Sequence, residues 1–185
     1  MAEPGEVYNG LEILIFGPAA EEINLWRKRY DPTYLEVDPH ITLAYPPFVP
    51  LEEWEKLKPD FVACLSEIKP FEIGIKEVSY FRKDSQEATY VLWLKPEDNG
   101  MIQQIRQILE GQLPLYVPKM SVDYIPHISI GFIEGEKALQ QALAEVKAEL
   151  KPFDFLVTEV IYEAQDKGRG IQFFDRLILG NDEIP

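Results

Sequence analysis

One five-residue phrase occurs twice in this chain and contains both of its histidines. The first copy spans residues 39–43, and the second spans residues 126–130, which lie 87 positions further on. In each copy a proline precedes the histidine, an isoleucine follows it, a hydroxyl residue comes next and an aliphatic residue closes the phrase. Two copies of His-x-Thr/Ser predict one site built symmetrically from two similar halves, so the fold must accommodate an internal repeat.

Two further repeats support a duplication of the chain. Residues 69–72 read Lys-Pro-Phe-Glu, and residues 151–154 read Lys-Pro-Phe-Asp, 82 positions later. The apolar runs at residues 12–16 and 90–94 align at a spacing of 78. We therefore predict a single bilobal domain formed by internal duplication, which covers residues 1–185 with approximate repeats 10–82 and 88–165 and a final strand 171–179.

The hydrophobic periodicity predicts alternating strands and helices. Apolar or alternating runs predict strands at residues 11–16, 39–45, 71–82, 89–95, 125–133, 153–165 and 171–179. Apolar residues spaced three or four apart predict helices at residues 21–30, 54–68, 98–109 and 136–150. Pro59 is expected to kink or split the second of these helices. The resulting fold class is α+β, with two pseudo-symmetric lobes, antiparallel sheets that line a central cleft, and helices packed outside.

Composition restricts the functions that such a fold could carry. The 185 residues contain no apolar run of membrane-spanning length, and the acidic N-terminus lacks the features of a signal peptide. Cys64 is the single cysteine, which excludes an internal disulfide and fits a cytoplasmic location. The net charge of −14 repels long polyphosphate backbones. We therefore expect a monomer that binds a small phosphorylated nucleotide or a short RNA end, and neither a membrane nor an extensive duplex.

Alternation along a strand places the two polar residues of each phrase on one face. His40 and Thr42 then point to the same side, as do His127 and Ser129, while the intervening isoleucines point into a core. Two such strands facing each other would hold a phosphate between two imidazoles and two hydroxyls. An imidazole has an unperturbed pKa of about 6.5, so one ring can act as general base and the other as general acid at neutral pH. The hydroxyls would donate to the phosphate oxygens, and the scheme requires no metal and no cofactor.

Other interpretations of these residues remain open at this point. A near-symmetric motif does not tell which histidine is the base, and a histidine beside a hydroxyl can also be a structural group. A zinc site would lack the carboxylate or thiol partners that usually complete it. The basic run Arg27-Lys28-Arg29 could bind phosphate, but its place at the end of a predicted helix favours an interaction with the helix dipole.

The paired phrases resemble the motifs of the two-histidine (2H) phosphoesterase superfamily, which includes 2′-5′ RNA ligase-like proteins and 2′,3′-cyclic nucleotide phosphodiesterases. The resemblance covers essentially the whole chain and implies two lobes with antiparallel sheets around a central cleft. It also implies that His40 and His127 are the catalytic acid/base pair and that Thr42 and Ser129 hold the substrate phosphate.

The resemblance further implies an activity, the metal-independent cleavage of 2′,3′-cyclic phosphates on nucleotides or RNA ends. After Leu43 the RNA ligase-like branch usually continues with phenylalanine and glycine, whereas residues 44–47 here read Ala-Tyr-Pro-Pro. Residues 27–32, followed closely by Pro39 and His40, are more similar to a bacterial branch of phosphoesterases. Two alternatives stand beside the phosphodiesterase: 2′-5′ RNA ligation, and the binding of nucleotides or RNA ends without useful turnover.

Overall fold

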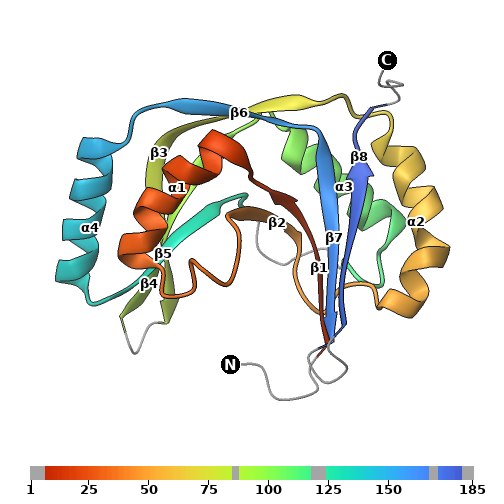
Figure 1. The fold of residues 1–185 in the computed structure, drawn as a ribbon, viewed down its shortest axis with the longest axis horizontal. Helices are drawn as coiled ribbons and strands as arrows, with labels where there is room; N and C mark the ends of the chain where they lie inside the picture. Colours follow the sequence, from red (N-terminus) through yellow and green to blue (C-terminus); the bar gives the residue numbers. More distant parts are fainter. Residues whose placement is uncertain (1–6, 85–87, 118–123, 167–170, 181–185) are drawn as a thin grey trace.

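The fold combines two antiparallel sheets with helices packed against them (Figure 1). The structure is a computed structural model that describes residues 7–84, 88–117, 124–166 and 171–180. The strands in these ranges are β1 (Val7–Leu14), β2 (His40–Ala44), β3 (Phe71–Asp84), β4 (Thr89–Glu97), β5 (Ile128–Glu134), β6 (Phe153–Val157), β7 (Glu159–Asp166) and β8 (Ile171–Ile178). The helices in these ranges are α1 (Gly17–Tyr30), α2 (Leu51–Leu65), α3 (Met101–Gln112) and α4 (Glu136–Glu149). This arrangement confirms the predicted α+β class.

Each sheet is assembled from strands of both halves of the chain. One sheet has the order β2-β1-β7-β8, and the other has the order β5-β4-β3-β6. Strand β3 of the first half pairs with β4 and β6, whereas β7 of the second half pairs with β1. The histidine strands β2 and β5 lie at the edges of their sheets and contact each other near the middle of the molecule (Figure 1).

The single strand predicted at residues 153–165 is wrong, because this segment forms two strands in two different sheets. Strand β6 pairs with β3, and strand β7, which begins two residues after β6 ends, pairs with β1. The carbonyl of Thr158, which lies between them, accepts a hydrogen bond from the N–H of Leu179 at 2.9 Å. No glycine, proline or asparagine marks the crossing, so the strand-like pattern continues through it and conceals the change of sheet.

The two copies of the Lys-Pro-Phe segment lead into β3 and β6, which pair with each other within one sheet. Phe71 of the first copy lies opposite Val157. Phe153 of the second copy lies opposite Ile75. Each phenylalanine thus lies opposite the residue four positions after the other phenylalanine, and such a register has a local two-fold axis at its centre. This is the register that a duplicated chain would produce, and the duplication itself stays a prediction.

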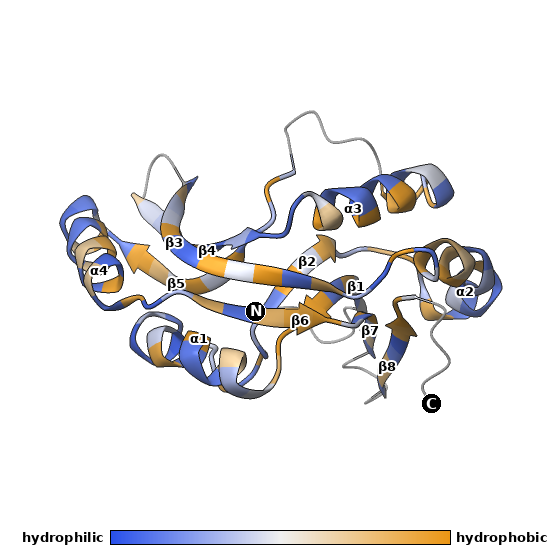
Figure 2. Ribbon diagram, turned by 90° about the horizontal axis from the view of Figure 1, so that it is seen from above, coloured by the Kyte–Doolittle hydropathy of each residue, from blue (hydrophilic) through white to orange (hydrophobic). Residues whose placement is uncertain are grey.

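Helices pack against both sheets. Helices α1 and α4 contact the sheet that contains β5, while α2 contacts β8 and α3 contacts β2. Figure 2 shows apolar strand residues between helices whose outward faces are polar. Helix α1 approaches β5 closely because Gly131 has no side chain, and a Cβ atom there would collide with Tyr30. Among the described helices, none combines the length and the apolar character that a membrane crossing requires.

Helix α2 is continuous, although a split at Pro59 was one of the two predicted outcomes. The helix runs from Leu51 to Leu65 with the proline inside it. A proline removes one hydrogen bond to the carbonyl four residues earlier, which here belongs to Glu55. Both residues are exposed, so water can satisfy the free carbonyl. The apolar face of the helix, which contains Trp54 and Phe61, stays buried against the core.

Candidate active site

The structure brings the two histidine phrases together at the contact between β2 and β5 (Figure 1). His40 is the first residue of β2, and His127 lies one residue before β5 begins. In both phrases the isoleucine is buried, while the histidine and the hydroxyl residue, Thr42 or Ser129, are partly exposed, as the alternation of faces predicts. The charge of protonated His127 lowers the pKa of His40, so the two imidazoles lie within electrostatic reach of each other.

Both imidazoles are held by the same kind of backbone contact. Nδ1 of His40 lies 2.9 Å from the carbonyl oxygen of Asp38. Nδ1 of His127 lies 2.9 Å from the carbonyl oxygen of Ile125. Because a carbonyl can only accept a hydrogen bond, we assign the hydrogen of each neutral ring to Nδ1. Nε2 then carries the lone pair in each ring and is the atom that can exchange a proton with a reacting group.

Burial lowers the pKa of both imidazoles. For His40 desolvation is the largest cause of the lowered pKa, and the charges of Arg27 and His127 act in the same direction. The backbone contact with Asp38 and the charge of Glu163 oppose this lowering of the pKa. For His127 desolvation again lowers the pKa, and its backbone hydrogen bond opposes the effect. Both rings are therefore biased toward the neutral form, in which Nε2 can accept a proton.

A β-bulge follows the hydroxyl residue in both histidine strands. In β2 the register with β1 shifts directly after Thr42, and in β5 the register with β4 shifts directly after Ser129. Bulges change the direction of side chains and are over-represented next to active sites. They also leave carbonyl groups without their usual partners in the sheet, so other donors must satisfy these groups.

Side chains from outside β2 satisfy the carbonyl groups at its bulge. Nη1 of Arg106 in α3 donates to the carbonyl of Leu43 at 2.7 Å, and Oη of Tyr124 donates to the carbonyl of Thr42 at 2.8 Å. The guanidinium lies 5.3 Å from the centre of the Tyr124 ring, and Nε pairs with Glu110 at 3.1 Å. Arg106 is buried. Sequence reasoning missed it, although a cation on the apolar stripe of a helix is a signal of such a role.

A carboxyl group that the motifs do not include lies beside His40. Glu12 of β1 is buried, and its Oε2 lies 3.9 Å from Nε2 of His40. Desolvation raises the pKa of Glu12 to about 8, together with the charge of Glu163, a hydrogen bond to Glu163 and the charge of Asp38. Glu12 is therefore protonated at neutral pH. The signal in the sequence was a glutamate inside an apolar strand, which is costly to bury without a partner.

His127 has aromatic neighbours instead of carboxyl groups. The rings of Phe81 and Trp93 lie 5.0 Å and 6.0 Å from its imidazole, and both contacts are edge-on. Phe81 and Trp93 stack on each other with their ring centres 4.7 Å apart. Trp93 is 6% exposed, and its Nε1–H has no hydrogen-bond partner within the described residues. The two histidines thus have different chemical surroundings, although their strands match.

The strand register makes Glu12 and Trp93 equivalent. Thr42 lies opposite Glu12 in one sheet, and Ser129 lies opposite Trp93 in the other. The two positions are 81 residues apart, so the alignment of the first strands at a spacing of 78 is wrong by three residues. An odd shift along a strand turns every side chain to the opposite face. Short apolar runs match one another at several shifts, which is why sequence comparison missed this pair.

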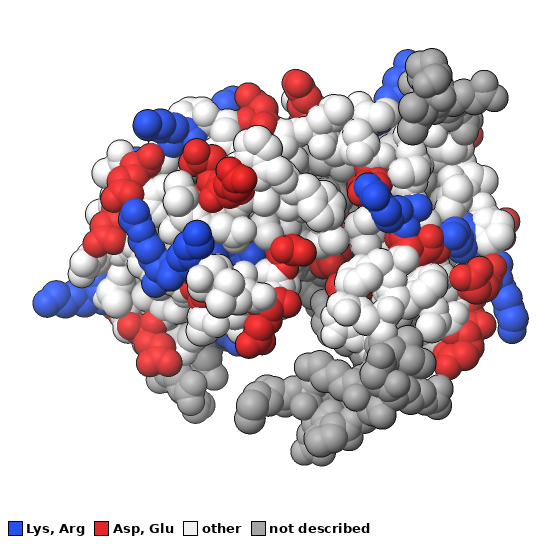
Figure 3. Space-filling model, in the orientation of Figure 1, with Lys and Arg blue, Asp and Glu red and all other residues white. Residues whose placement is uncertain are grey.

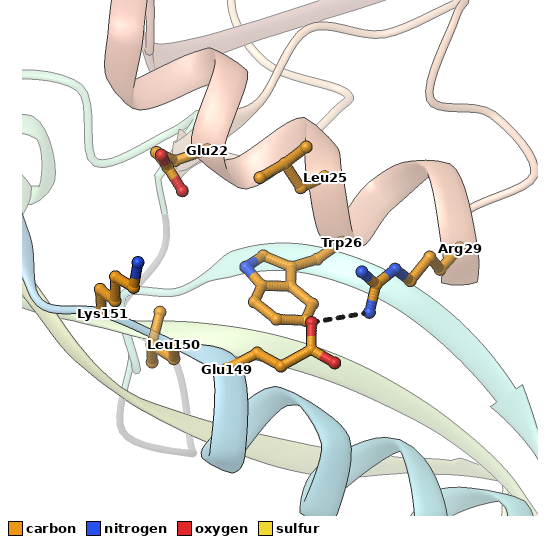
Figure 4. A pocket seen from close by; sticks show the side chains of 7 residues that line it. All are labelled: Glu22, Leu25, Trp26, Arg29, Glu149, Leu150 and Lys151. Atoms are coloured by element: carbon orange, nitrogen blue, oxygen red, sulfur yellow. Dashed lines mark hydrogen bonds and ion pairs between the residues drawn. The ribbon is translucent and has the colours of Figure 1, made fainter.

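The basic run at residues 27–29 contacts carboxylates. Arg27 pairs with Asp31 at 2.9 Å at the end of α1, and Arg29 pairs with Glu149 of α4 at 3.0 Å. Arg29 also borders a pocket of about 220 Å³ between α1 and the end of α4, which contains none of the four predicted site residues (Figure 4). These contacts favour a structural role for the run at the end of α1 over a phosphate-binding role.

Charged side chains on the surface are mixed in sign. On the face drawn in Figure 3, cations are scattered among carboxylates and do not gather into one stripe. Within the ranges that the structure describes, no group of three or more His, Cys, Asp and Glu side chains is placed to hold a metal ion.

Solved structures share this fold at low sequence identity. Escherichia coli LigT, crystallised in complex with 3′-AMP, matches with a TM-score of 0.60 and 18% identity, covering 97% of this chain and 100% of LigT. A Thermus thermophilus protein matches with a TM-score of 0.63 and 16% identity, covering 95% of this chain and 100% of that protein. Together with the two sheets and four helices of the described residues, these matches confirm the predicted 2H phosphoesterase fold.

Sequence comparison then identifies the family. Residues 16–169 match the 2′-5′ RNA ligase superfamily, and the chain belongs to that superfamily. A Geobacillus kaustophilus protein named "Putative phosphoesterase" is 31% identical over 121 residues, which are 64% of this chain and 66% of that protein. The predicted resemblance to 2H phosphoesterases, and to their bacterial branch, is confirmed by these matches.

Proposed function

We propose that this chain is a phosphoesterase that opens 2′,3′-cyclic phosphates of nucleotides or RNA ends by histidine acid/base catalysis, without a metal ion. The observation that carries the proposal is the pair of imidazoles at the contact between β2 and β5, each oriented through Nδ1. His40 and His127 are the candidate proton-transfer groups. Thr42 and Ser129, two positions further along the same faces, are the candidate ligands of the phosphate.

The proposed reaction is a displacement at phosphorus. One imidazole takes a proton from water while the water oxygen bonds to phosphorus. The other imidazole gives a proton to the ribose oxygen whose bond to phosphorus breaks. The two hydroxyls donate hydrogen bonds to the non-bridging oxygens, on which negative charge grows in the transition state. The product is a nucleoside or RNA end with one phosphomonoester and one free neighbouring hydroxyl.

Family membership supports this reaction class. The superfamily name refers to the joining of RNA, and the name of the Geobacillus kaustophilus relative refers to phosphoester chemistry. LigT was crystallised with 3′-AMP, and a nucleoside 3′-monophosphate is one of the two products that opening of a 2′,3′-cyclic phosphate can give. A cyclic nucleotide is therefore the first substrate to test on this chain.

The test is an assay of the purified protein with 2′,3′-cyclic mononucleotides and with an oligonucleotide that ends in a 2′,3′-cyclic phosphate, both in excess chelator. We expect at least one of them to yield a phosphomonoester, and we expect His40→Ala and His127→Ala to abolish most of that product. Folded wild-type protein that leaves both substrates intact would contradict the proposal. Activity that disappears in chelator and returns with a divalent metal would also contradict it.

Binding of nucleotides or RNA ends without turnover is the competing function. It is favoured because Arg27 and Arg29 pair with carboxylates. These two cations are therefore engaged in structural contacts and do not serve as clamps for a substrate phosphate. Product formation that is lost in His40→Ala would exclude it.

Ligation would use a 5′-hydroxyl in place of water, and the same assay with added 5′-hydroxyl RNA would detect the joined strand. The cytoplasmic location and the monomeric state stay predictions.

A further inference from the structure

The two halves of the candidate site differ at positions that the strand registers make equivalent. Beside His40, Glu12 and Glu163 form a hydrogen-bonded carboxyl pair. The equivalent positions beside His127 carry Trp93 and Phe81, whose rings stack. One half therefore offers hydrogen-bond acceptors, while the other offers flat apolar rings, and a substrate cannot fit both halves in the same way.

We propose that Glu12 and Glu163 bind the attacking water beside His40, so that His40 is the general base and His127 is the general acid. This inference rests on the proposed phosphoesterase function and goes beyond it by assigning each histidine to one of the two proton transfers. An attacking water has two O–H bonds, of which the base takes one proton, and a second acceptor must hold the other bond. The departing ribose oxygen needs one donor only, which the protonated His127 supplies.

The distance between Glu12 and His40 suits a water held by both. Oε2 of Glu12 and Nε2 of His40 are 3.9 Å apart, with 8% of the Glu12 side chain and 27% of the His40 side chain exposed. An oxygen that makes hydrogen bonds of about 2.8 Å to both atoms would do so at an angle of about 90°, which is close to the angle between the O–H bonds of water. The second proton stays on the oxygen and becomes the P–OH hydrogen of the product.

The aromatic half suits the nucleoside. In an in-line displacement the attacking and departing oxygens lie on opposite sides of phosphorus, so the nucleoside lies away from the water. Phe81 is half-buried, and Phe132, on the same face of its sheet, is 41% exposed with Nζ of Lys83 5.2 Å from its ring centre. Nucleobases stack on such rings. Trp93, whose Nε1–H has no hydrogen-bond partner among the residues that the structure describes, belongs to the same aromatic group.

The carboxyl pair also makes binding depend on pH. The groups that act on Glu12 are Glu163 of β7 and Asp38 before β2, His40 of β2 lies beside it, and Arg27 of α1 acts on His40. Because burial and Glu163 raise the pKa of Glu12 to about 8, Glu12 is protonated at neutral pH and ionises above that value. The negative charge of ionised Glu12 would then repel the substrate phosphate, so kcat/KM should fall as Glu12 ionises.

The main test is the partition of a 2′,3′-cyclic nucleotide between hydrolysis and methanolysis in water–methanol mixtures. Methanol has one O–H bond and would turn its methyl group toward Glu12, so the wild type should prefer water. Glu12→Leu removes the acceptor and accommodates the methyl group, so the ratio of methyl ester to hydrolysis product should rise by about tenfold. Trp93→Leu, at the equivalent position of the other half, is the matched control and should leave the ratio unchanged.

The outcomes separate this inference from the proposed function. An unchanged ratio in folded Glu12→Leu, with wild-type turnover intact, overturns the role of Glu12 and leaves the phosphoesterase proposal standing. The absence of any reaction by folded wild type overturns both. Glu12→Gln provides a second measurement, because it keeps an acceptor and the size of the side chain but cannot ionise. It should remain active at neutral pH and lose only the part of the alkaline decline that sets in near pH 8. The decline that follows loss of the His127 proton begins at lower pH and should remain. An unchanged profile near pH 8 would overturn the inference.

The acid role of His127 has its own test. A cyclic substrate with sulfur in place of the departing ribose oxygen needs no proton for departure, because a thiolate is a far better leaving group than an alkoxide. His127→Ala should therefore recover much of its rate on the sulfur substrate, while His40→Ala should remain as slow as on the oxygen substrate. The reverse pattern, or equal recovery in both variants, would overturn the assignment.

Discussion

Each imidazole of the candidate site can exchange a proton with substrate only through Nε2, because Nδ1 is hydrogen-bonded to a backbone carbonyl. Loss of either ring therefore removes one complete proton transfer. We expect His40→Ala and His127→Ala each to lower kcat by about 10²–10⁴. Thr42→Ala and Ser129→Ala should each cost about 10–100-fold, because a hydroxyl binds phosphate without moving a proton.

The measurement is kcat and KM on a 2′,3′-cyclic nucleotide, with circular dichroism as the control for folding. The double histidine variant should lose less than the product of the two single losses, because the two rings act as one unit. Full activity in either single histidine variant would contradict a site built from both phrases.

The carboxyl group of Glu12 gives the stability of the protein a pH dependence. Its pKa is about 8 in the folded protein and 4.5 in an ordinary environment, so between these values the folded state binds more protons than the unfolded state. Stability should therefore fall as the pH rises toward 8. The lowered pKa of His40 and of His127 acts in the opposite direction, because the unfolded state then binds the extra protons, and this effect is confined to pH values below about 6.5.

We expect the Tm of the wild type to fall between about pH 6.5 and pH 9, and we expect Glu12→Gln to reduce this slope. Thermal unfolding at a series of pH values and constant ionic strength measures the slope of Tm against pH. Glu21→Gln, which changes an exposed residue of α1, is the control for the loss of one carboxyl group and should behave like the wild type. Identical slopes in the wild type and Glu12→Gln would contradict a buried, protonated Glu12.

At the scale of elements, β2 depends on α3 for the geometry of its bulge. Arg106→Met should leave the carbonyl of Leu43 without its donor and lower the free energy of unfolding by about 1–3 kcal/mol. It should also lower kcat, because the bulge directly follows Thr42. Urea unfolding checks the first effect. Arg29→Met, which removes an exposed cation paired with Glu149, is the control and should change little. Equal stability losses in the two variants would contradict this role of Arg106.

The approach of α1 to β5 gives a second prediction at this scale. Gly131→Ala should destabilise the protein, because the added Cβ atom meets the backbone and side chain of Tyr30, neither of which can move without displacing the helix. Gly111→Ala is the matched control in α3, where a Cβ atom meets nothing within 4 Å. It should stabilise the helix by about 0.5–1 kcal/mol. Urea midpoints of the two variants should move in opposite directions, and a neutral Gly131→Ala would contradict the close packing.

For the whole molecule, the sequence predicted the α+β class and the meeting of the two histidine phrases, because periodicity and a repeated motif encode both. It could not predict that residues 153–165 divide between two sheets, because the crossing at Thr158 has no turn residue. Nor could it predict Glu12 beside His40 or Arg106 at the bulge, because these contacts depend on strand register and helix packing. The fold and the family are confirmed by relatives, while the catalytic roles of the two histidines stay predictions.

Strand β3 of the first half pairs with β4, and strand β7 of the second half pairs with β1, so neither half of the chain can complete a sheet alone. A fragment that contains β1, β2 and β3 would leave β1 with an open edge and β3 without a neighbour. Open edges recruit other strands, and the strand most like the missing β7 is β3 of a second identical fragment. Such fragments should therefore associate as a strand-exchanged homodimer. The intact chain has the connectivity of that dimer with its two subunits joined by one linker, and its two histidines correspond to the same residue in each subunit.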